Sequence, residues 1–407
     1  MKVLHILAQL PERTGSGVYF TNVIKGLKNY SDLEQACIYA KDINYQEINI
    51  LEKNNQYEVV FNTEKLPFNI AGMSDVMPYP NTVYSSMTSS MISAWQQAFL
   101  EQLNLARKNF NPDIIITHHL WMLSSLVTEV FYDKKIIGVC HNTDIRQAEK
   151  NPTLKEKYVT NLHKLDKIIS LSNDQIKEIE KVYNYDRKNI INLGAGFSEK
   201  IFYPLEHYPK KEKVELLYAG KFDDSKGFYE LIKAFKILEK KYNNITLDLI
   251  GNLTDENKER IFSLIDNSKN ITIYNTKNQK HLADIMREKD IFILPSYFEG
   301  LGLIAVEALG SGVRSVTTEI AGLMELLGDE INKSGVIEYV KMPTIYDTDK
   351  AVEEEKPAFV ARLAEKISLQ IERTKQNRPL DKNILNEILK HSWQEKIKKL
   401  YNIIIKL

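Results

Sequence analysis

Two carboxylates lie eight positions apart in residues 290–312, with two glycines between them. Glu299 comes directly before Gly300 and Gly302, and Glu307 follows them. The residues before Glu299 include a short apolar run bounded by proline and serine, which indicates a buried parallel strand. After Gly302, apolar side chains recur at helical spacing until two further glycines end the pattern. We therefore expect a strand, a glycine turn that carries Glu299, and a helix that carries Glu307.

This order of elements predicts an anion-binding site. The first N–H groups of a helix have no intrahelical acceptor, the helix dipole is positive at that end, and glycines allow a ligand to approach the backbone. A site that binds phosphate through backbone N–H groups and hydroxyls through carboxylates suits a nucleotide-sugar. The alternative is an ordinary strand–helix unit whose two glutamates are solvated.

Polar side chains also follow two apolar runs in the first half of the chain. Residues 113–117 are followed by His118 and His119, of which His119 is the candidate, and residues 135–140 are followed by His141, with Asp144 and Arg146 just beyond. Open α/β sheets bind ligands at the carboxyl ends of their strands, which makes these residues candidates for a site. The alternative is that each histidine is a structural residue with satisfied hydrogen bonds.

The loop after the predicted first strand, residues 3–10, contains Gly15 and Gly17 before an amphipathic helix. A dinucleotide fingerprint needs a third glycine three positions later, where this chain has phenylalanine, so a nicotinamide site is not expected. Arg13 in the same loop is either a cation of a binding site or a solvated side chain. The aperiodic stretch 66–84 is a candidate acceptor-side loop or a connector, because long loops in compact domains are often functional.

The segment from Pro295 to Gly312 closely resembles the E-x7-E signature of retaining glycosyltransferases of family 4. The resemblance implies the GT-B fold, an α/β architecture of two Rossmann-like doubly wound parallel-sheet domains that face each other across a cleft. It implies that catalytic Glu299 faces the donor sugar and that Glu307 binds the ribose. The turn backbone would bind the pyrophosphate through Gly300, Leu301, Gly302 and Leu303. Two positions depart from the family pattern: Leu301 replaces a phenylalanine, and Arg314 replaces a proline.

Other segments extend the resemblance along the chain. The family's Gly-Arg … Lys-Gly pattern is matched with Lys221 in place of the arginine and with Lys226 retained. Both cations would bind the donor and neutralise the leaving diphosphate, and Lys226 would be catalytic. His141 matches a catalytic-site histidine at a strand end, and Gly15 and Gly17 match a loop that approaches the donor phosphate. The tentative acceptor residues are Arg13, His119, Asp144 and Arg146.

A chain of 407 residues is long enough for two α/β domains with separate cores. Residues 206–213 are charged, contain a proline and show no period, which is typical of a linker. We therefore expect an acceptor-side domain at residues 1–205 and a nucleotide-sugar-binding domain at residues 206–390. The resemblance adds a last helix, residues 391–407, that crosses back onto the first domain.

Composition excludes several classes of partner. Lys plus Arg and Asp plus Glu both number 54, and no long basic run exists, so nucleic acid is not an expected partner. Cys37 and Cys140 make neither a metal spacing nor a disulfide framework. Asp347-Thr-Asp349 superficially matches the DxD metal motif of GT-A glycosyltransferases, but we expect it in a surface loop. No metal or cofactor is therefore predicted.

The N-terminal residues resemble a first strand rather than a signal peptide, and no apolar run reaches 18 residues. We expect no transmembrane segment and a cytoplasmic location, while peripheral membrane contact stays open. The expected activity is that of a retaining, metal-independent glycosyltransferase (a hexosyltransferase of class EC 2.4). Its donor would be a nucleotide-sugar, with UDP favoured by the family, and its acceptor is an unknown small molecule, glycan, lipid or protein. The alternatives are a GT-B nucleotide-sugar epimerase and a catalytically silent nucleotide-sugar-binding protein.

Overall fold

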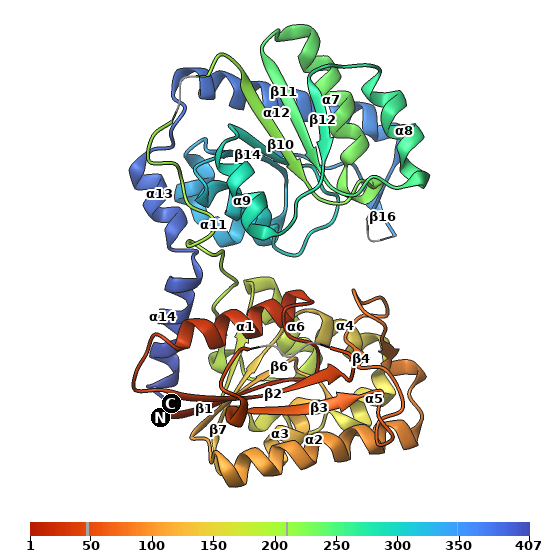
Figure 1. Cartoon of the computed structure of the whole chain (residues 1–407), viewed down its shortest axis with the longest axis vertical. Coiled ribbons are helices and arrows are strands. Elements are labelled where there is room, and N and C mark those ends of the chain that lie inside the picture. Colours follow the sequence, from red (N-terminus) through yellow and green to blue (C-terminus); the bar gives the residue numbers. More distant parts are fainter. Residues whose placement is uncertain (46–48, 209–210, 348) are drawn as a thin grey trace. The chain divides into compact units, whose positions relative to one another are not determined.

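A computed structural model of the chain describes residues 1–407 except 46–48, 209–210 and 348. The chain forms two compact units (Figure 1): unit 1 comprises Met1–Ala195 and Lys396–Leu407, and unit 2 comprises Gly196–Glu395. The sequence predicted the first boundary ten residues later, after residue 205. The boundary between the units lies earlier in the chain, because Phe197 and Phe202 are buried in a hydrophobic core of unit 2.

Unit 1 contains a seven-stranded parallel sheet in the order β3-β2-β1-β6-β7-β8-β9. Its strands are β1 (Lys2–Leu7), β2 (Glu34–Asp42), β3 (Gln56–Phe61), β6 (Ile114–His118), β7 (Lys135–Val139), β8 (Lys167–Ser170) and β9 (Ile190–Asn192). The strand order reverses between β1 and β6, which is where open α/β sheets bind ligands.

The helices of unit 1 are α1 (Gly15–Leu27), α2 (Ser89–Asn109), α3 (Met122–Val130), α4 (Thr143–Lys150), α5 (Pro152–Tyr158) and α6 (Asn173–Tyr183). The predicted loop at residues 66–84 contains only two short paired strands, β4 (Ala71–Gly72) and β5 (Thr82–Val83), followed at its end by a 3-10 turn that starts at Tyr84. The predicted first strand is three residues too long at its end, because β1 stops at Leu7.

Unit 2 contains a six-stranded parallel sheet in the order β12-β11-β10-β13-β14-β15. Its strands are β10 (Val214–Ala219), β11 (Ile245–Ile250), β12 (Ile271–Tyr274), β13 (Ile291–Leu294), β14 (Arg314–Thr318) and β15 (Ile337–Val340). The strand β15 was not predicted. A small antiparallel pair, β16 (Ile345–Tyr346) and β17 (Lys350–Ala351), lies outside this sheet.

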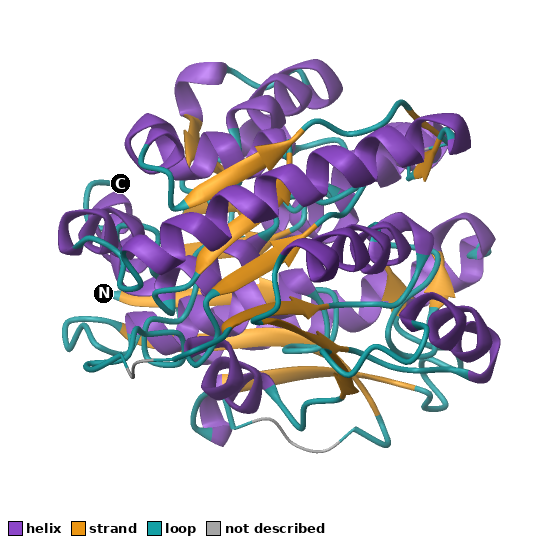
Figure 2. Cartoon of the chain, turned by 90° about the horizontal axis from the view of Figure 1, so that it is seen from above, coloured by secondary structure: helices purple, strands orange, loops and turns teal. Residues whose placement is uncertain are grey.

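The helices of unit 2 are α7 (Phe228–Lys241), α8 (Asp255–Ile265), α9 (Gln279–Arg287), α10 (Leu303–Gly310), α11 (Ala321–Lys333), α12 (Lys356–Gln376) and α13 (Lys382–Leu389). Successive residues of a strand point to opposite faces of the sheet. In β10, Leu216 and Tyr218 join the core under α7 and α12, while Leu217 and Ala219 join the core under α9, α10 and α13. Both faces are therefore covered by helices, which flank the strands in Figure 2.

These observations confirm the predicted fold class of two Rossmann-like α/β domains. The last helix, α14 (Trp393–Ile404), begins in unit 2 and ends in unit 1. Ile397, Leu400 and Ile404 of this helix are buried, and Ile397 packs directly against Gly26 of α1.

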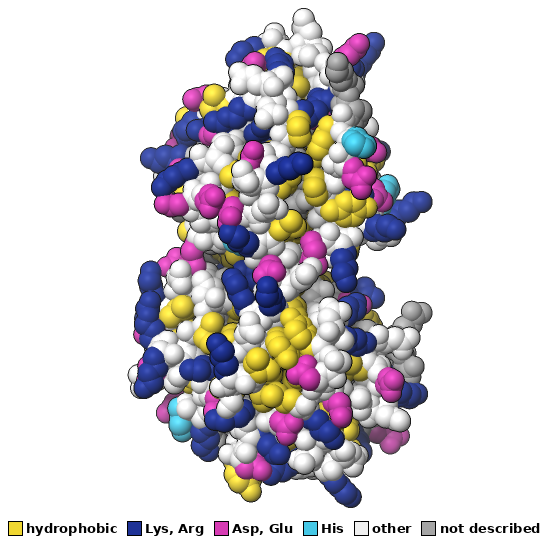
Figure 3. Space-filling view, turned by 90° about the vertical axis from the view of Figure 1, so that its left-hand side faces the viewer, with side chains coloured by type: hydrophobic (Ala, Val, Ile, Leu, Met, Phe, Trp, Pro, Cys, Tyr) yellow, Lys and Arg dark blue, Asp and Glu magenta, His cyan; other side chains and the backbone are white. Residues whose placement is uncertain are grey.

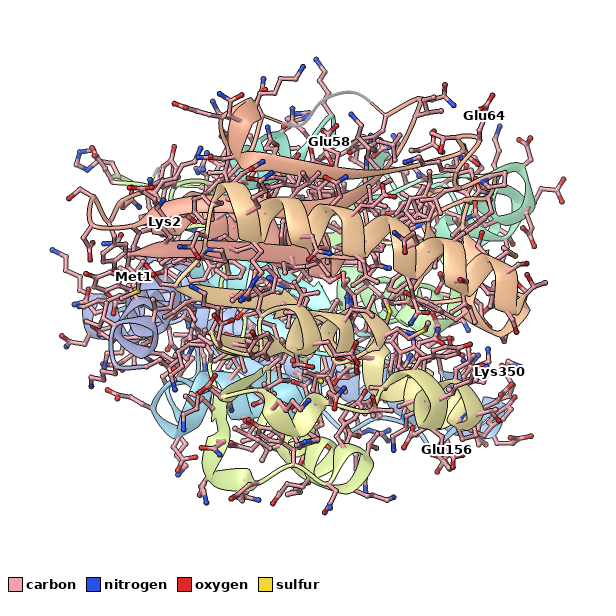
Figure 4. All side chains as sticks on the ribbon, turned by 90° about the horizontal axis from the view of Figure 1, so that it is seen from below. Met1, Lys2, Glu58, Glu64, Glu156 and Lys350 are labelled. Atoms are coloured by element: carbon pink, nitrogen blue, oxygen red, sulfur yellow. The ribbon has the colours of Figure 1, made fainter. Side chains whose placement is uncertain are left out.

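Charged side chains of both signs are interspersed over the face shown in Figure 3. Glu64, Glu156 and Lys350 are exposed and lie at the periphery of the view in Figure 4. Lys350 Nζ lies 2.6 Å from Asp347, so the first carboxylate of the DxD-like triplet is part of a surface ion pair. None of the described helices is both long and apolar enough to cross a membrane.

Candidate functional site

The glycine turn predicted between β13 and α10 is present in unit 2. The strand ends at Leu294 and the helix begins at Leu303, with Gly302 as its N-cap at φ 59°. An ideal Cβ on Gly302 would lie 3.3 Å from Leu294 Cδ2 and 3.3 Å from Ile320 Cδ1. Glycine adopts this left-handed backbone without the steric cost that other residues carry. The turn therefore leads directly into a helix N-terminus, whose first N–H groups have no intrahelical acceptor.

Glu299 lies in this turn and is held by two groups. Its Oε1 accepts hydrogen bonds from Ser296 Oγ at 2.9 Å and from Lys226 Nζ at 2.8 Å. The ammonium of Lys226 also lies 3.4 Å from the carbonyl oxygen of Phe298. Both charged side chains are about one-quarter exposed, so their pair is only partly screened by water. The fold thus joins two residues that are 73 positions apart in the sequence.

The position of Lys226 is set by a single turn of 3-10 helix after β10. Asp223 Oδ1 accepts hydrogen bonds from Ser225 Oγ at 2.7 Å and from Lys226 N at 3.1 Å. Gly227 follows at φ 59°, and an ideal Cβ there would lie 2.1 Å from the carbonyl oxygen of Pro295. Close contact between Gly227 and the start of the glycine turn therefore brings Lys226 to Glu299.

Glu307 lies on α10 and is partly buried. Its Oε1 accepts a hydrogen bond at 3.1 Å from Nε2 of Gln279, the first residue of α9. Burial raises the pKa of the Glu307 carboxyl to about 7 from its ordinary 4.5, and the bond from Gln279 opposes that rise. The carboxyl group therefore titrates closer to neutral pH than an ordinary glutamate, and it has acceptor capacity left for a ligand hydroxyl.

A cavity of about 870 Å³ opens at the carboxyl ends of β10 and β11 in unit 2. Its size falls in the range of small-molecule sites. Lys221 and Ile304 line it, together with the segments that follow β11 and β12. Lys221 is exposed there and does not join the Lys226–Glu299 pair. Another cavity of about 920 Å³, lined by residues from 204–214 and 374–385 and by Asn244, contains none of the predicted site residues.

Three histidines of unit 1 gather at the carboxyl ends of β6 and β7. His118 is the last residue of β6, and its Nδ1 lies 3.0 Å from Nε2 of His141, which follows β7. The ring of His119 lies 4.9 Å from that of His141. His118 and His119 are buried, whereas His141 is partly exposed. Burial lowers the pKa of His141 to about 3, so this ring is neutral at physiological pH.

Asp144 joins the two loops that carry these histidines. Its Oδ2 accepts from Leu120 N at 2.7 Å, and its Oδ1 accepts from His141 N at 3.0 Å. The side chain is fully buried, and burial raises its pKa. A carboxylate enclosed in this way does not reach a ligand, so Asp144 has a positioning role here in place of the predicted contact with an acceptor. Arg146, two residues on, is exposed.

Gly15 and Gly17 were predicted in the loop before the first helix, but they are the first and third residues of α1, and only Arg13 lies before the helix. An ideal Cβ on Gly17 would lie 2.6 Å from the carbonyl oxygen of Leu10, so this glycine is required by packing, whereas Gly15 faces open space. Gly17 N donates to Thr14 Oγ1 at 3.0 Å, so the side chain of Thr14 caps the N-terminus of α1. Arg13 is exposed, and its Nε donates to Tyr45 Oη at 3.0 Å.

Sequence reasoning missed four residues of these clusters: Ser296, Gln279, His118 and Asp223. Ser296 and Asp223 lie within three residues of Glu299 and Lys226, and short polar side chains at such loop positions are a usable signal. Gln279 left no such signal, because its partner Glu307 lies 28 positions away. His118 was visible as a polar residue at a predicted strand end, but its partner His141 lies 23 positions away, so their contact was not predictable.

With this geometry established, we compared the chain with known proteins. Residues 202–357 match the family model described as "Glycosyl transferases group 1", and residues 76–192 match "Glycosyltransferase Family 4". The capsular polysaccharide biosynthesis glycosyltransferase CapM of Staphylococcus aureus is 29% identical over 39% of this chain and 44% of its own length. The N-acetyl-alpha-D-glucosaminyl L-malate synthase of Bacillus anthracis is 22% identical over 67% of this chain and 73% of its own length. The chain spans about half the length of the first curated relatives it matches.

Solved structures show the same fold over whole chains. Sucrose-phosphate synthase from Thermosynechococcus elongatus has a TM-score of 0.67 at 15% identity and covers 100% of this chain and 98% of its own. Anabaena HepE, solved in complex with UDP and glucose, has a TM-score of 0.62 at 14% identity and covers both chains fully (100%). The UDP-GlcNAc 2-epimerase from Neisseria meningitidis, at 10% identity, also covers both chains fully (100%), with a TM-score of 0.58.

Proposed function

We propose that this chain, a glycosyltransferase family 4-like protein of GT-B fold, transfers a sugar from a nucleotide-diphospho-sugar to an acceptor hydroxyl and retains the anomeric configuration. One observation carries the proposal: Lys226 and Glu299 pair at 2.8 Å in the turn that opens α10, while Glu307 lies on the same helix. A cation, a helix N-terminus and two carboxylates are thereby grouped in unit 2, where a cavity of about 870 Å³ also lies at the strand ends.

Each group has a role in this proposal. An ammonium has three donors, and Lys226 uses two of them on Glu299 and on the carbonyl of Phe298, so the third is available to the diphosphate. The N–H groups at the start of α10 bind the same diphosphate, and Lys221 adds positive charge from the wall of the cavity. These charges stabilise the leaving diphosphate as the anomeric bond breaks. Glu307 accepts hydrogen bonds from the ribose, and Glu299 faces the sugar ring.

The family models favour transfer over epimerisation. Both transferases and an epimerase share the fold, so fold likeness does not separate the two activities. The two family models that match both describe glycosyltransferases. UDP is the proposed nucleotide, because HepE was solved with UDP and glucose. The acceptor is unassigned, and the proposed residues for it in unit 1 are the exposed Arg13 and Arg146 and the partly exposed His141. His119 was also predicted to contact the acceptor, but like Asp144 it is buried, so it is not proposed.

A thermal-shift panel of UDP, GDP and ADP tests nucleotide binding. A ligand present at 100 times its dissociation constant adds about 2.7 kcal/mol to stability, so the matching diphosphate should raise the melting temperature clearly. Incubation with the UDP-sugar, followed by separation of products, then tests the reaction. Release of UDP together with an acceptor that carries the sugar in the anomeric configuration of the donor supports retaining transfer. Free sugar or an epimerised sugar formed without an acceptor supports the epimerase, and binding without any product identifies a silent protein.

The proposed activity needs no metal ion, because cationic side chains and helix N–H groups supply the positive charge near the diphosphate. We expect UDP release to continue in excess EDTA. Loss of turnover with EDTA and recovery with Mg²⁺ or Mn²⁺ would contradict the roles given to Lys221 and Lys226. In that case the carboxylates at Asp347 and Asp349 become the residues to test.

A further inference from the structure

The contact between His118 and His141 has a consequence for the chemistry that His141 can offer. His118 Nδ1 and His141 Nε2 are 3.0 Å apart, and their rings are nearly parallel, with an interplanar angle of 15°. Both nitrogens lie at hydrogen-bond distance, so one donates and the other accepts. Only the Nδ1 atom of His141 is then left for a ligand.

The structure holds this pair firmly in place. His118 lies opposite Val139 in the register of β6 and β7, and Asp144 binds the backbone N–H groups of both Leu120 and His141. Both loops also contain a residue other than glycine in the left-handed region, His119 at φ 69° and Asn142 at φ 66°. Such backbone conformations are unfavourable for residues with a Cβ and persist where the surroundings impose them, often at functional sites.

Both rings are neutral, because burial lowers the pKa of His118 well below its usual value and that of His141 to about 3. A neutral imidazole has one N–H group and one lone pair. The direction of the shared hydrogen bond therefore decides which nitrogen of His141 carries its proton.

The surroundings of His118 distinguish the two directions. Its ring is fully buried between the aromatic rings of Tyr19 and Phe20, at centroid distances of 6.0 and 5.3 Å, and its Nε2 has no partner among the described residues. If His141 donated, His118 Nε2 would be a buried N–H without an acceptor. If His118 donates from Nδ1, its Nε2 is a bare lone pair. Among buried backbone groups, donors without partners are rarer than under-satisfied acceptors. The same preference, applied to the ring nitrogens, favours donation from His118.

We propose that His118 is a positioning residue whose Nδ1–H donates to Nε2 of His141 and thereby holds the proton of His141 on Nδ1. His141 then presents a neutral N–H donor at the end of β7. This donor suits an oxygen acceptor such as a sugar hydroxyl. A nitrogen that carries a proton cannot accept one, so His141 is not a general base in this arrangement. The ligand class rests on the proposed function, but the tautomer does not.

The tautomer can be measured directly in the full-length protein labelled with ¹⁵N-histidine. A long-range ¹H–¹⁵N correlation spectrum separates protonated from unprotonated ring nitrogens, and His141→Gln identifies the signals of His141 among the eight histidines. We expect His141 with its proton on Nδ1. A wild-type spectrum with the proton on Nε2 would overturn the proposal, whatever the activity of the protein.

Two substitutions at position 118 form a matched pair. His118→Phe keeps a ring of similar size but has no hydrogen bond to offer, so His141 should change to a mixture of tautomers. His118→Asn offers an N–H close to the position of Nδ1 and should keep the proton of His141 on Nδ1. An unchanged His141 spectrum in His118→Phe would show that His118 does not set the tautomer. If that variant does not fold, the wild-type and His118→Asn spectra still decide the question.

Kinetics supply a second readout. Loss of one correctly oriented neutral hydrogen bond in the transition state corresponds to about a 2- to 10-fold decrease in kcat/KM. We expect His118→Phe to lower kcat/KM for the UDP-sugar by that factor, and His118→Asn to retain more activity than His118→Phe. Affinity for UDP alone should not follow this order, because His118 lies in unit 1 and the diphosphate is placed on unit 2. A protein without turnover would contradict the proposed function while leaving the tautomer result intact.

Discussion

At the scale of single residues, the two glutamates of the glycine turn and its helix occupy different environments. Glu299 already neutralises Lys226, whereas Glu307 contacts the neutral amide of Gln279 and is partly buried. Different partners imply different roles. Glu307 would bind the ribose equally before and during the reaction, and Glu299 would act on the positive charge that develops on the sugar ring.

Substitution by glutamine should separate these roles. A hydrogen bond to a charged group contributes roughly 1.5–3 kcal/mol, so Glu307→Gln should weaken UDP binding about ten-fold or more and raise the KM for the donor. Glu299→Gln should mainly lower kcat and leave UDP affinity nearly unchanged, since UDP lacks the donor sugar that Glu299 would contact. Calorimetric titration with UDP and steady-state kinetics measure both effects. Equal loss of UDP affinity in the two variants would show that the carboxylates share one role.

The raised pKa of Glu307 also predicts a pH dependence of stability. Between pH 4.5 and about pH 7 the folded protein keeps the proton of Glu307 while the unfolded chain releases it. Stability falls with rising pH wherever the folded state binds more protons than the unfolded state. The stabilisation that comes from protonated Glu307 is therefore lost as the pH rises to about 7. The free energy of unfolding of Glu307→Gln minus that of the wild type should therefore increase over this interval and then level off.

Chemical denaturation at a series of pH values measures that difference. Glu354→Gln, at an exposed position, is the control for loss of one negative charge. If the free energy of unfolding of Glu307→Gln minus that of the wild type stays constant from pH 4.5 to pH 8, the pKa of Glu307 is not raised in the folded protein.

At the scale of elements, the site depends on two left-handed glycines that join strands to helices. Gly227 lies against the carbonyl of Pro295, and Gly302 caps α10. By contrast, Gly300 has no atom within 4 Å of its ideal Cβ and is not in the left-handed region. These differences should be visible in stability alone, before any ligand binds.

We expect Gly302→Ala to lower the free energy of unfolding by about 1–2 kcal/mol, the cost of a left-handed backbone for a residue with a Cβ. Gly227→Ala should cost more, because its Cβ would also lie 2.1 Å from the carbonyl oxygen of Pro295. Gly300→Ala is the matched control and should change stability little. Urea denaturation ranks the three variants by their free energy of unfolding. An equal loss of stability in all three would contradict the geometry of the turn.

At the scale of the whole molecule, unit 1 is assembled from both ends of the chain. Residues 396–407 belong to it, and Tyr401 stacks on Tyr30 with ring centroids 3.9 Å apart and donates to Asp32 at 2.8 Å. The last helix is therefore part of the core of unit 1 and not an appendage. The contribution of this helix to the stability of unit 1 can be measured by truncating one of its buried side chains.

Ile397→Ala should lower the stability of unit 1 by about 2–5 kcal/mol, because it removes a buried side chain and leaves a cavity against α1. Ile405→Ala is the control from the same end of the chain. Its side chain is 45% exposed, and the change should stay within about 0.5 kcal/mol. Thermal unfolding compares the two, and an equally small effect of Ile397→Ala would show that the last helix does not stabilise unit 1.

Local patterns predicted much of the secondary structure, and the family resemblance added the two-domain architecture. Short apolar runs such as 291–294, when glycine, proline and amphipathic stretches bound them, favour buried strands, so many of the parallel strands and the turn before α10 were predictable. The exceptions include β15, the short pairs β4–β5 and β16–β17, and the early end of β1. Apolar pattern alone does not show where pairing stops, because pairing depends on the neighbouring strand.

The sequence by itself therefore determined the fold class, the glycine turn and the identity of Glu299, Glu307 and Lys226 as a group of interest. Only the tertiary structure decided which side chains meet: Lys226 with Glu299, Gln279 with Glu307, and His118 with His141. It also decided that Asp144 is enclosed, although its position beyond a strand end suggested a ligand contact. The physical reason is that parallel strands bring distant segments to one edge of a sheet. Contacts and burial at that edge depend on how strands and loops pack, and this information is not local in the chain.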